Sequence, residues 1–442
     1  MSAKLTIQAQ RDRVERLVAR LEARKLAVRD AEVTLAAAKR TLNSLVDPMA
    51  RLPLELQSGI FLLTGTDHEP DPDGSPLNLL FVCHMWHDIA VATPRLWNRI
   101  VIESLPREAD FARACGNWMK RAHPFPLSVE LRQIHEVGES MQKVLCQYAR
   151  SIEKLEISLS DDIPWDECNE ETGGLYLHTS PFEIHGASFS SLKTLSLKSH
   201  VDGELQLTDD DWIDLLAAAP ELVECQLMNF AQYTGNLQPD IEHLTLASLR
   251  QLQLEASSWS WVTSTATMLL RLTLPALESL YISTFDISGV EMQDFLTRSS
   301  PPLQSLVMAI PQIPEPMSVV AGILPLVPSL TDLDLSDVVE KQRSNEPFLA
   351  FLKMMGSNPD ILPNLQNLTI SPSHPYKLDF TRFTELLLQV FATRHQQLKS
   401  FQLLFGDSKG KLSDDIISGF KKIGSNGIDF HVGPYGTNWL DD

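Results

Sequence analysis

The chain has little glycine for its length and no long hydrophobic run. Its 442 residues include 20 glycines against 27 prolines. So few glycines leave little material for the glycine-rich loops that bind phosphate groups, whereas the prolines can punctuate many short elements. The longest apolar stretch, Val319 to Pro328, is too short to span a bilayer and is broken by proline. The composition therefore argues against a glycine-rich phosphate site and against a membrane-spanning segment.

Cysteine is also scarce, and its spacing is not that of a disulfide or zinc-binding framework. The five cysteines, at positions 83, 115, 146, 168 and 225, are odd in number and form no CxxC pair. This argues against a disulfide scaffold or a structural zinc and favours a reducing compartment. Residues 1–16 lack the apolar core of a secretory signal. We therefore expect a cytoplasmic or nuclear protein.

Basic side chains are in the minority. Lys and Arg number 37 against 57 Asp and Glu, which gives a net charge of −20. Residues 1–46 nevertheless hold ten basic and five acidic side chains, spread around what is expected to be a helix. Because an acidic chain repels phosphate backbones unless a basic patch is set apart, nucleic acid is not an expected partner.

Residues 1–46 predict one long helix with the spacing of a coiled coil. Apolar residues recur every seven positions at Ile7, Val14, Leu21, Val28, Leu35 and Leu42, and three residues later at Leu17, Ala31, Ala38 and Leu45, with Arg24 as a break. This alternation of three and four defines the apolar seam of a coiled coil. We expect pairing with a second copy of the chain, as a homodimer, or with another helix. Packing against its own protein is the alternative.

Residues 47–103 predict a small group of short helices. Leu56, Ile60 and Leu63 fall on one helical face after Pro53, which the first turn of a helix tolerates. A second apolar stripe follows an acidic loop over residues 64–75 and ends at Pro94. A core this small is marginal by itself, and a partner's surface would stabilise it.

An ordered set of residues runs through this segment: Leu52-Pro53, Glu55, Ile60-Phe61, Val82-Cys83, Trp86 and Pro94-x-Leu96-Trp97. This set resembles the F-box, the adaptor-binding module of Skp–cullin–F-box (SCF) ubiquitin ligases. The acidic loop is longer than the family usually has. The resemblance implies a Skp-type adaptor, and through it a cullin, as partners. The adaptor-binding residues that it implies are Leu52, Pro53, Leu56, Ile60, Val82, Cys83, Trp86, Leu96 and Trp97.

From residue 151 onward an apolar pattern repeats. The template apolar-x-x-apolar-x-apolar begins at Ile152, Leu192, Leu222, Leu249, Leu277, Leu303, Leu330, Leu365 and Leu398. Four consecutive steps of 26 to 28 residues indicate a true internal repeat. Helical stretches separate several of the motifs, so each unit predicts a strand, a turn and usually a helix. Stacked units would place parallel strands on one side and helices on the other.

This pattern resembles the leucine-rich repeat, although the units are long and the usual asparagine after the strand is missing. The expected fold is of the α+β or α/β solenoid class, curved, with outer helices. It divides into a coiled-coil helix (1–46), an F-box (47–103), a connecting helical segment (104–150) and a leucine-rich-repeat-like solenoid (151–442). An F-box followed by such repeats is the layout of a substrate receptor, and the N-terminal helix resembles a variant common among fungal F-box proteins.

The outward strand positions of the nine motifs predict a polar binding face. Of these 27 positions, 15 hold Ser, Thr, Gln or Asn, five are acidic and two are lysine. An exposed aromatic, Tyr281, stands beside Val307 in the next unit and is a plausible anchor. The predicted target-binding residues of this concave face are Gln226, Gln253, Glu255, Tyr281, Val307 and Asp334. A structural patch covered by a loop is the alternative.

No set of residues predicts a catalytic or metal site. Cys83, His84 and His87 lie close together, but a second ligand pair is missing. Glu69 to Gly74 copies only half of a calcium loop, and Gly406 to Lys411 is an incomplete phosphate loop. We therefore expect no cofactor, no metal and no enzyme activity in this chain.

The sequence thus predicts a non-catalytic receptor that docks a Skp-type adaptor and holds a protein target. The alternative is a scaffold in which the coiled coil and the repeats join partners without any ligase role. Copurification of the adaptor and the cullin separates the two.

Overall fold

The computed structural model divides the chain into two compact units. Unit 1 comprises residues 1–98 and 120–125, and unit 2 comprises residues 99–119 and 126–442. The structure describes residues 2–64, 76–103, 109–134, 137–159, 187–199, 205–233, 243–256, 265–283, 289–310, 316–337, 346–372, 378–394, 397–405, 414–424, 428–434 and 436–441.

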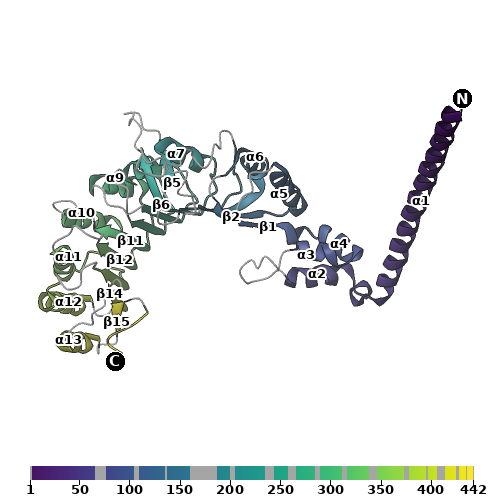
Figure 1. The fold of residues 1–442 in the computed structure, drawn as a ribbon. Coiled ribbons are helices and arrows are strands. Elements are labelled where there is room, and N and C mark those ends of the chain that lie inside the picture. Colours follow the sequence, from purple (N-terminus) through teal and green to yellow (C-terminus); the bar gives the residue numbers. More distant parts are fainter. Residues whose placement is uncertain are drawn as a thin grey trace. The chain divides into compact units, whose positions relative to one another are not determined.

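Unit 1 is helical. Its elements are α1 (Ser2–Val46), η1 (Pro48–Arg51), α2 (Leu54–Thr64), α3 (Leu77–Val82), α4 (His84–Val91) and η3 (Pro94–Trp97) (Figure 1). Helix α1 runs for 45 residues without interruption, as the heptad spacing predicts. Asp47 ends it by capping η1, since its carboxylate accepts a hydrogen bond from the Met49 N–H at 2.9 Å.

Unit 2 is built on one parallel sheet. Its described strands are β1 (Arg99–Glu103), β2 (Leu127–Ile134), β3 (Ile152–Leu159), β4 (Thr194–Lys198), β6 (Glu224–Tyr233), β8 (Gln251–Ala256), β10 (Ser279–Ser283), β11 (Ser305–Ile310), β12 (Asp332–Asp337), β13 (Asn367–Ser371), β14 (Ser400–Phe405) and β15 (Asp429–Pro434). They pair in this order along the sheet. Strand β5 (Leu205–Thr208) pairs with β6 outside this path, and β7 (Leu244–Thr245) pairs with β9 (Leu272–Thr273).

The repeated apolar residues of the sequence lie in register. The fourth template position of each unit pairs with that of the next, as Leu252 does with Leu280 and Leu280 with Leu306. The aligned residues are all buried: Ile100, Val129, Leu155, Leu195, Cys225, Leu252, Leu280, Leu306, Leu333, Leu368, Phe401 and Phe430. Because side chains alternate along a strand, the residues between them project from the opposite face.

The helices of unit 2 form a second layer. They are α5 (Ala109–Ala122), α6 (Glu139–Tyr148), α7 (Asp209–Ala217), α8 (Thr265–Leu270), α9 (Gly289–Ser299), α10 (Pro316–Ile323), α11 (Glu346–Ser357), α12 (Phe380–Arg394) and α13 (Asp414–Gly424), with short η4 (Ala149–Ser151) and η6 (Leu324–Leu326). From α7 to α13 each helix contacts the next one along the chain. Figure 1 shows α10 to α13 along one side of the sheet. Phe383 and Phe391 of α12 meet Phe401 of β14, so aromatic rings fill the space between the layers there.

Two expectations about the region before residue 151 require correction. The segment 104–150 was expected to be helical, but it contains strand β2 between α5 and α6. The sheet also begins earlier than residue 151, because β1 lies inside the segment expected to be the F-box. The reason is that apolar residues recur at every second position and are buried there: Ile100 and Ile102 in β1, and Leu127, Val129 and Leu131 in β2.

Candidate functional site

The small helical module of unit 1 has a compact core. Phe61, Leu79, Ile89 and Ala90 are buried, and Met49, Leu80, Met85, Trp86 and Leu96 pack against them. The rings of Phe61 and Trp86 lie with their centroids 5.0 Å apart. The module therefore uses the aromatic residues of its sequence pattern to hold α2 against α4.

Polar side chains fix the ends of these helices. The indole N–H of Trp86 donates to Asp47 at 3.0 Å, and the buried Gln57 amide donates to the carbonyls of Met49 at 2.6 Å and Leu52 at 2.8 Å. Thr93 donates to the Ile89 carbonyl at 2.7 Å. Since these groups satisfy backbone carbonyls and a partly buried indole, they orient the short helices without a large core.

Several predicted adaptor-binding residues lie outside that core. Leu56 is 55% exposed, Ile60 is 39% exposed and Val82 is 57% exposed, and Pro53 is exposed as well. Leu56 and Ile60 are four residues apart on α2, so they share one helical face. Leu52, Cys83, Trp86 and Leu96 are only partly buried. Exposed apolar side chains in such numbers are typical of surfaces that bind other proteins.

Trp97 occupies a different place from the one expected. Its side chain is fully buried, its indole N–H donates to the Ala90 carbonyl at 2.8 Å, and the Arg121 guanidinium lies 4.6 Å from the ring centroid. A side chain enclosed in this way supports the module from within. We therefore assign Trp97 to the interior of unit 1 and not to a contact with a partner.

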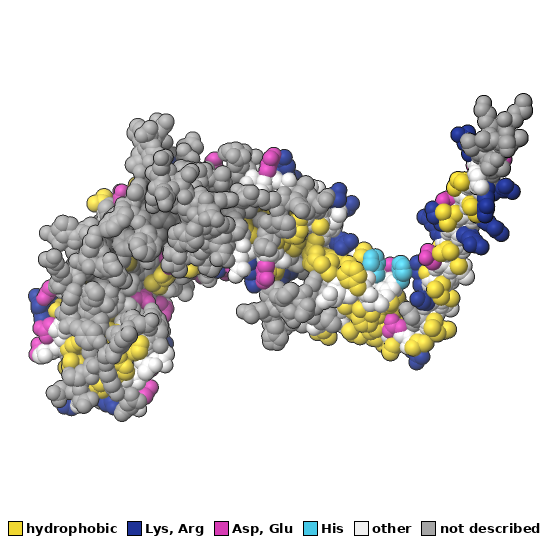
Figure 2. Space-filling view, viewed as in Figure 1, with side chains coloured by type: hydrophobic (Ala, Val, Ile, Leu, Met, Phe, Trp, Pro, Cys, Tyr) yellow, Lys and Arg dark blue, Asp and Glu magenta, His cyan; other side chains and the backbone are white. Residues whose placement is uncertain are grey.

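The structure adds residues that the sequence pattern did not single out. Phe81 of α3 is 83% exposed, and Leu54 and Leu63 of α2 are exposed too. Figure 2 shows hydrophobic side chains gathered over the α2–α4 module. An aromatic residue just before Val82 was the available signal, because exposed aromatics are enriched where proteins bind one another. We call Pro53, Leu56, Ile60, Phe81 and Val82 the exposed apolar set.

The second surface is the face of the sheet opposite the buried leucines, which we call the strand face. Five of the six predicted target-binding residues lie in one row across consecutive strands: Gln226, Gln253, Tyr281, Val307 and Asp334. Glu255 lies two residues beyond Gln253 and pairs with Met228 and Ser283. All six side chains are partly exposed. The row continues through Glu130, Glu156 and Ser196 on one side and Thr369, Gln402 and His431 on the other.

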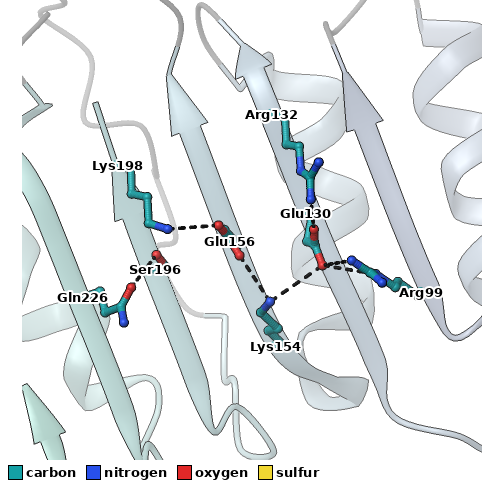
Figure 3. Close-up of polar contacts among 8 residues, drawn as sticks. All are labelled: Arg99, Glu130, Arg132, Lys154, Glu156, Ser196, Lys198 and Gln226. Carbon is teal, nitrogen blue, oxygen red and sulfur yellow. Dashed lines mark hydrogen bonds and ion pairs between the residues drawn. The ribbon is translucent and has the colours of Figure 1, made fainter. Parts of the chain in front are cut away.

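Strands β1 to β4 carry a charged network on this face (Figure 3). The buried Glu130 carboxylate accepts from Arg99 at 3.0 Å and Arg132 at 2.9 Å, and Lys154 lies 3.7 Å away. Lys154 and Lys198 each lie 3.2 Å from Glu156. Burial raises the pKa of Glu156, but the hydrogen bonds and charges of the two lysines outweigh it and leave the pKa below its ordinary value. The sequence pattern did not single out Glu130, because strand β2 was not predicted.

Beyond β4 the charged residues at the described strand-face positions are all acidic. These positions carry five acids and no lysine or arginine, and the acids are Glu224, Glu255, Asp332, Asp334 and Asp429. One oxygen of Asp334 is buried without a hydrogen-bond partner in the described part of the chain. Burial raises the pKa of this carboxyl group. The strand face is therefore cationic in places near β1 to β4 and acidic from β6 onward.

The described residues form no metal site. No group of three or more His, Cys, Asp or Glu side chains in them is arranged to hold a metal ion. Residues 69–74 and 406–411, considered above as partial calcium and phosphate loops, lie outside the described residues. Over the same part of the chain, no helix combines the length and the hydropathy needed to cross a membrane.

No family model matches the chain, and no curated protein matches it either. The assignment of its function therefore depends on the residues and contacts described above.

Proposed function

We propose that the chain is the substrate-recognition subunit of an SCF ubiquitin ligase. Residues 47–103 would form the F-box that docks a Skp-type adaptor, and the adaptor would bring the cullin. One observation carries this proposal: Pro53, Leu56, Ile60 and Val82 of the exposed apolar set are predicted adaptor-binding positions, while Phe61 and Trp97 of the same pattern are buried. A module that needed these apolar side chains only for its own folding would have enclosed them.

In this proposal unit 2 is a leucine-rich-repeat-like solenoid that holds the protein target. The strand face offers many rigid hydrogen-bonding side chains at no ordering cost, with Tyr281 and Val307 paired as an apolar anchor. Its charges favour a target segment that is basic over β6–β15 and acidic over β1–β4. The receptor itself would carry out no chemistry. It would raise the effective concentration of the target near the conjugating enzyme, in the cytoplasm or the nucleus.

The experiment is affinity purification of the full chain with the proteasome blocked. The proposal expects the adaptor and the cullin to copurify in stoichiometric amounts, and expects ubiquitylation of a captured protein to depend on the chain. Capture of other proteins without adaptor and cullin would contradict the ligase assignment and favour the scaffold alternative.

A further inference from the structure

Helix α1 carries an uncovered apolar seam. Seven large seam residues are each more than half exposed: Val14, Leu17, Leu21, Val28, Leu35, Leu42 and Leu45. Every described side chain from residue 10 to residue 42 is exposed. Near its C-terminal end, α1 contacts the module through Arg40, whose guanidinium lies 3.1 Å from His84 Nε2. A 45-residue helix with such a seam is stabilised chiefly by packing against another helix.

The charges of α1 are not spread evenly around it, contrary to the expectation from sequence. With Ile7 at the first seam position, the flanking positions carry five basic residues and one acid, Glu32; the basic ones are Arg11, Arg13, Arg20, Lys25 and Lys39. Four other acids, Asp12, Glu15, Glu22 and Asp30, lie on the outer positions. Figure 2 shows Lys and Arg side chains alternating with hydrophobic ones along this helix. The positive charge is therefore concentrated where a partner helix would contact the seam.

This pattern opposes pairing between two copies of the chain. In a parallel pair, Arg20 would face Lys25 of the other copy, twice by symmetry, and Arg24 would face its own counterpart inside the seam. In a centred antiparallel pair, Arg11 would face Lys39 and Lys25 would face itself. Neither arrangement sets a basic flanking residue against an acid. Like charges at facing positions disfavour pairing with a second copy of the chain.

We propose that α1 binds a helix of another protein whose seam is apolar and whose flanking positions are acidic. The apolar seam supplies the contact area, and the basic flanks select the partner by charge. Arg24 would face an acidic residue within the partner's seam, which fixes the register of the pair. The proposal does not depend on the ligase assignment, because it concerns residues 10–46 alone.

The test uses the full chain and two synthetic probe helices. Both probes have six heptads with the same Val and Leu seam, interrupted by one Glu that would face Arg24; one carries Glu and the other Lys at every flanking position. We expect the Glu probe to bind at least about tenfold more tightly than the Lys probe at low salt, and this ratio to shrink as the salt rises. Fluorescence anisotropy measures the affinities, and sedimentation gives the oligomeric state.

Paired variants show whether the basic flanking residues cause the preference for the Glu probe. Arg20→Glu with Lys25→Glu should lower the preference for the Glu probe by at least about threefold, as expected for two reversed charge pairs. The control, Arg16→Glu with Arg29→Glu, makes the same change of charge on outer positions and should leave the preference unchanged. Circular dichroism must show equal helix content in both. Equal binding of the two probes, binding of neither, or a stable dimer of the full chain that the Glu probe does not displace would each overturn the proposal.

Discussion

Arg394 is a buried arginine that donates hydrogen bonds to the C-terminal end of the preceding helix. It lies on α12 with only 2% of its surface exposed, and its guanidinium donates to the carbonyls of Met355, Asn358, Ile361 and Leu362. These carbonyls belong to the end of α11 and the turn after it, where a helix leaves carbonyls without partners. Arg298 of α9 likewise donates to the carbonyls of Leu269, in the last turn of α8, and of Leu272, just after that helix. An arginine in the last turn of one helix thus satisfies the end of the helix before it.

Replacing Arg394 with alanine should lower the free energy of unfolding by about 2–4 kcal/mol, because several buried carbonyls lose their donor and a cavity forms. Arg394→Lys should recover only part of the loss, since an ammonium lacks the planar set of donors. Chemical denaturation of the full chain measures the change. The control is Arg382→Ala on the same helix, which removes an exposed ion pair with Glu346 and should cost less than about 1 kcal/mol. Equal losses would show that Arg394 has no special role.

The cysteines should differ in reactivity by their burial. Burial raises the pKa of Cys115 to about 11 and raises that of Cys225 as well, whereas Cys83 is only partly buried. Because the thiolate is the reactive form, Cys83 should be alkylated before Cys115 and Cys225 near pH 8, and the latter two only after unfolding. Peptide mapping by mass spectrometry separates the sites. Labelling of Cys225 in the native protein as fast as Cys83 would contradict its place in the row of buried core residues.

At the scale of elements, the sequence pattern predicted nine of the twelve described strands that pair in order along the sheet and overlooked three. The template also fits Trp97-x-x-Ile100-x-Ile102 and Pro126-x-x-Val129-x-Leu131, and β15 continues it with Phe430 and Val432. Trp97 to Pro126 is 29 residues and Pro126 to Ile152 is 26, close to the spacing of the central units. These strands were missed because the first position holds tryptophan, proline or glycine instead of leucine. The short helices α8 and α10 had too few turns to show a period.

The charged network of β1 to β4 should make a pH-dependent contribution to stability. The pKa of Glu156 is lowered in the folded state, so the unfolded chain binds the proton more readily. The stabilisation is therefore fully present above the ordinary carboxyl value and is lost as the pH falls through the lower, folded pKa. Glu156→Gln should reduce the melting temperature at pH 7 and have a smaller effect near pH 3.

A second variant of this network probes the buried carboxylate. Glu130→Gln leaves Arg99 and Arg132 without their charged partner, so we expect a loss of about 1–3 kcal/mol at pH 7. Glu103→Gln, an exposed acid on β1, serves as the control and should change little. Thermal unfolding between pH 3 and pH 8 tests both variants. A Glu156→Gln effect that grows on acidification would contradict the sign of the linkage.

For the whole molecule, the two surfaces should act independently, because they lie in different units. Tyr281→Ala removes an apolar anchor from the strand face, and such anchors typically contribute about 2 kcal/mol to binding. We expect weaker capture of the target, by about thirtyfold, with adaptor binding unchanged. Asp214 of α7 is charged and lies on the helical layer, so its reversal to lysine should change target capture little. If Asp214→Lys weakens capture and Tyr281→Ala does not, the target binds the helical side.

The sequence was least informative about which side chains of a motif face outward. Trp97 belongs to the pattern that resembles the F-box, yet it is buried, and Phe81 lies outside the pattern, yet it is the more exposed aromatic. Spacing alone places residues on a helix, but burial depends on how α2, α3 and α4 pack. In contrast, the row from Gln226 to Asp334 could be predicted, because a constant template forces parallel strands into register.

The affinity of the purified chain for a purified Skp-type adaptor tests the central proposal most directly. We expect binding by calorimetry in wild type and a loss of at least about thirtyfold for Leu56→Asp with Ile60→Asp, since each anchor typically contributes about 2 kcal/mol. Leu388→Asp on α12 introduces one such charge at a similarly exposed leucine and should bind as wild type does. Circular dichroism must show that all three proteins are folded. Absence of binding in wild type, or undiminished binding by the folded double variant, would contradict the account.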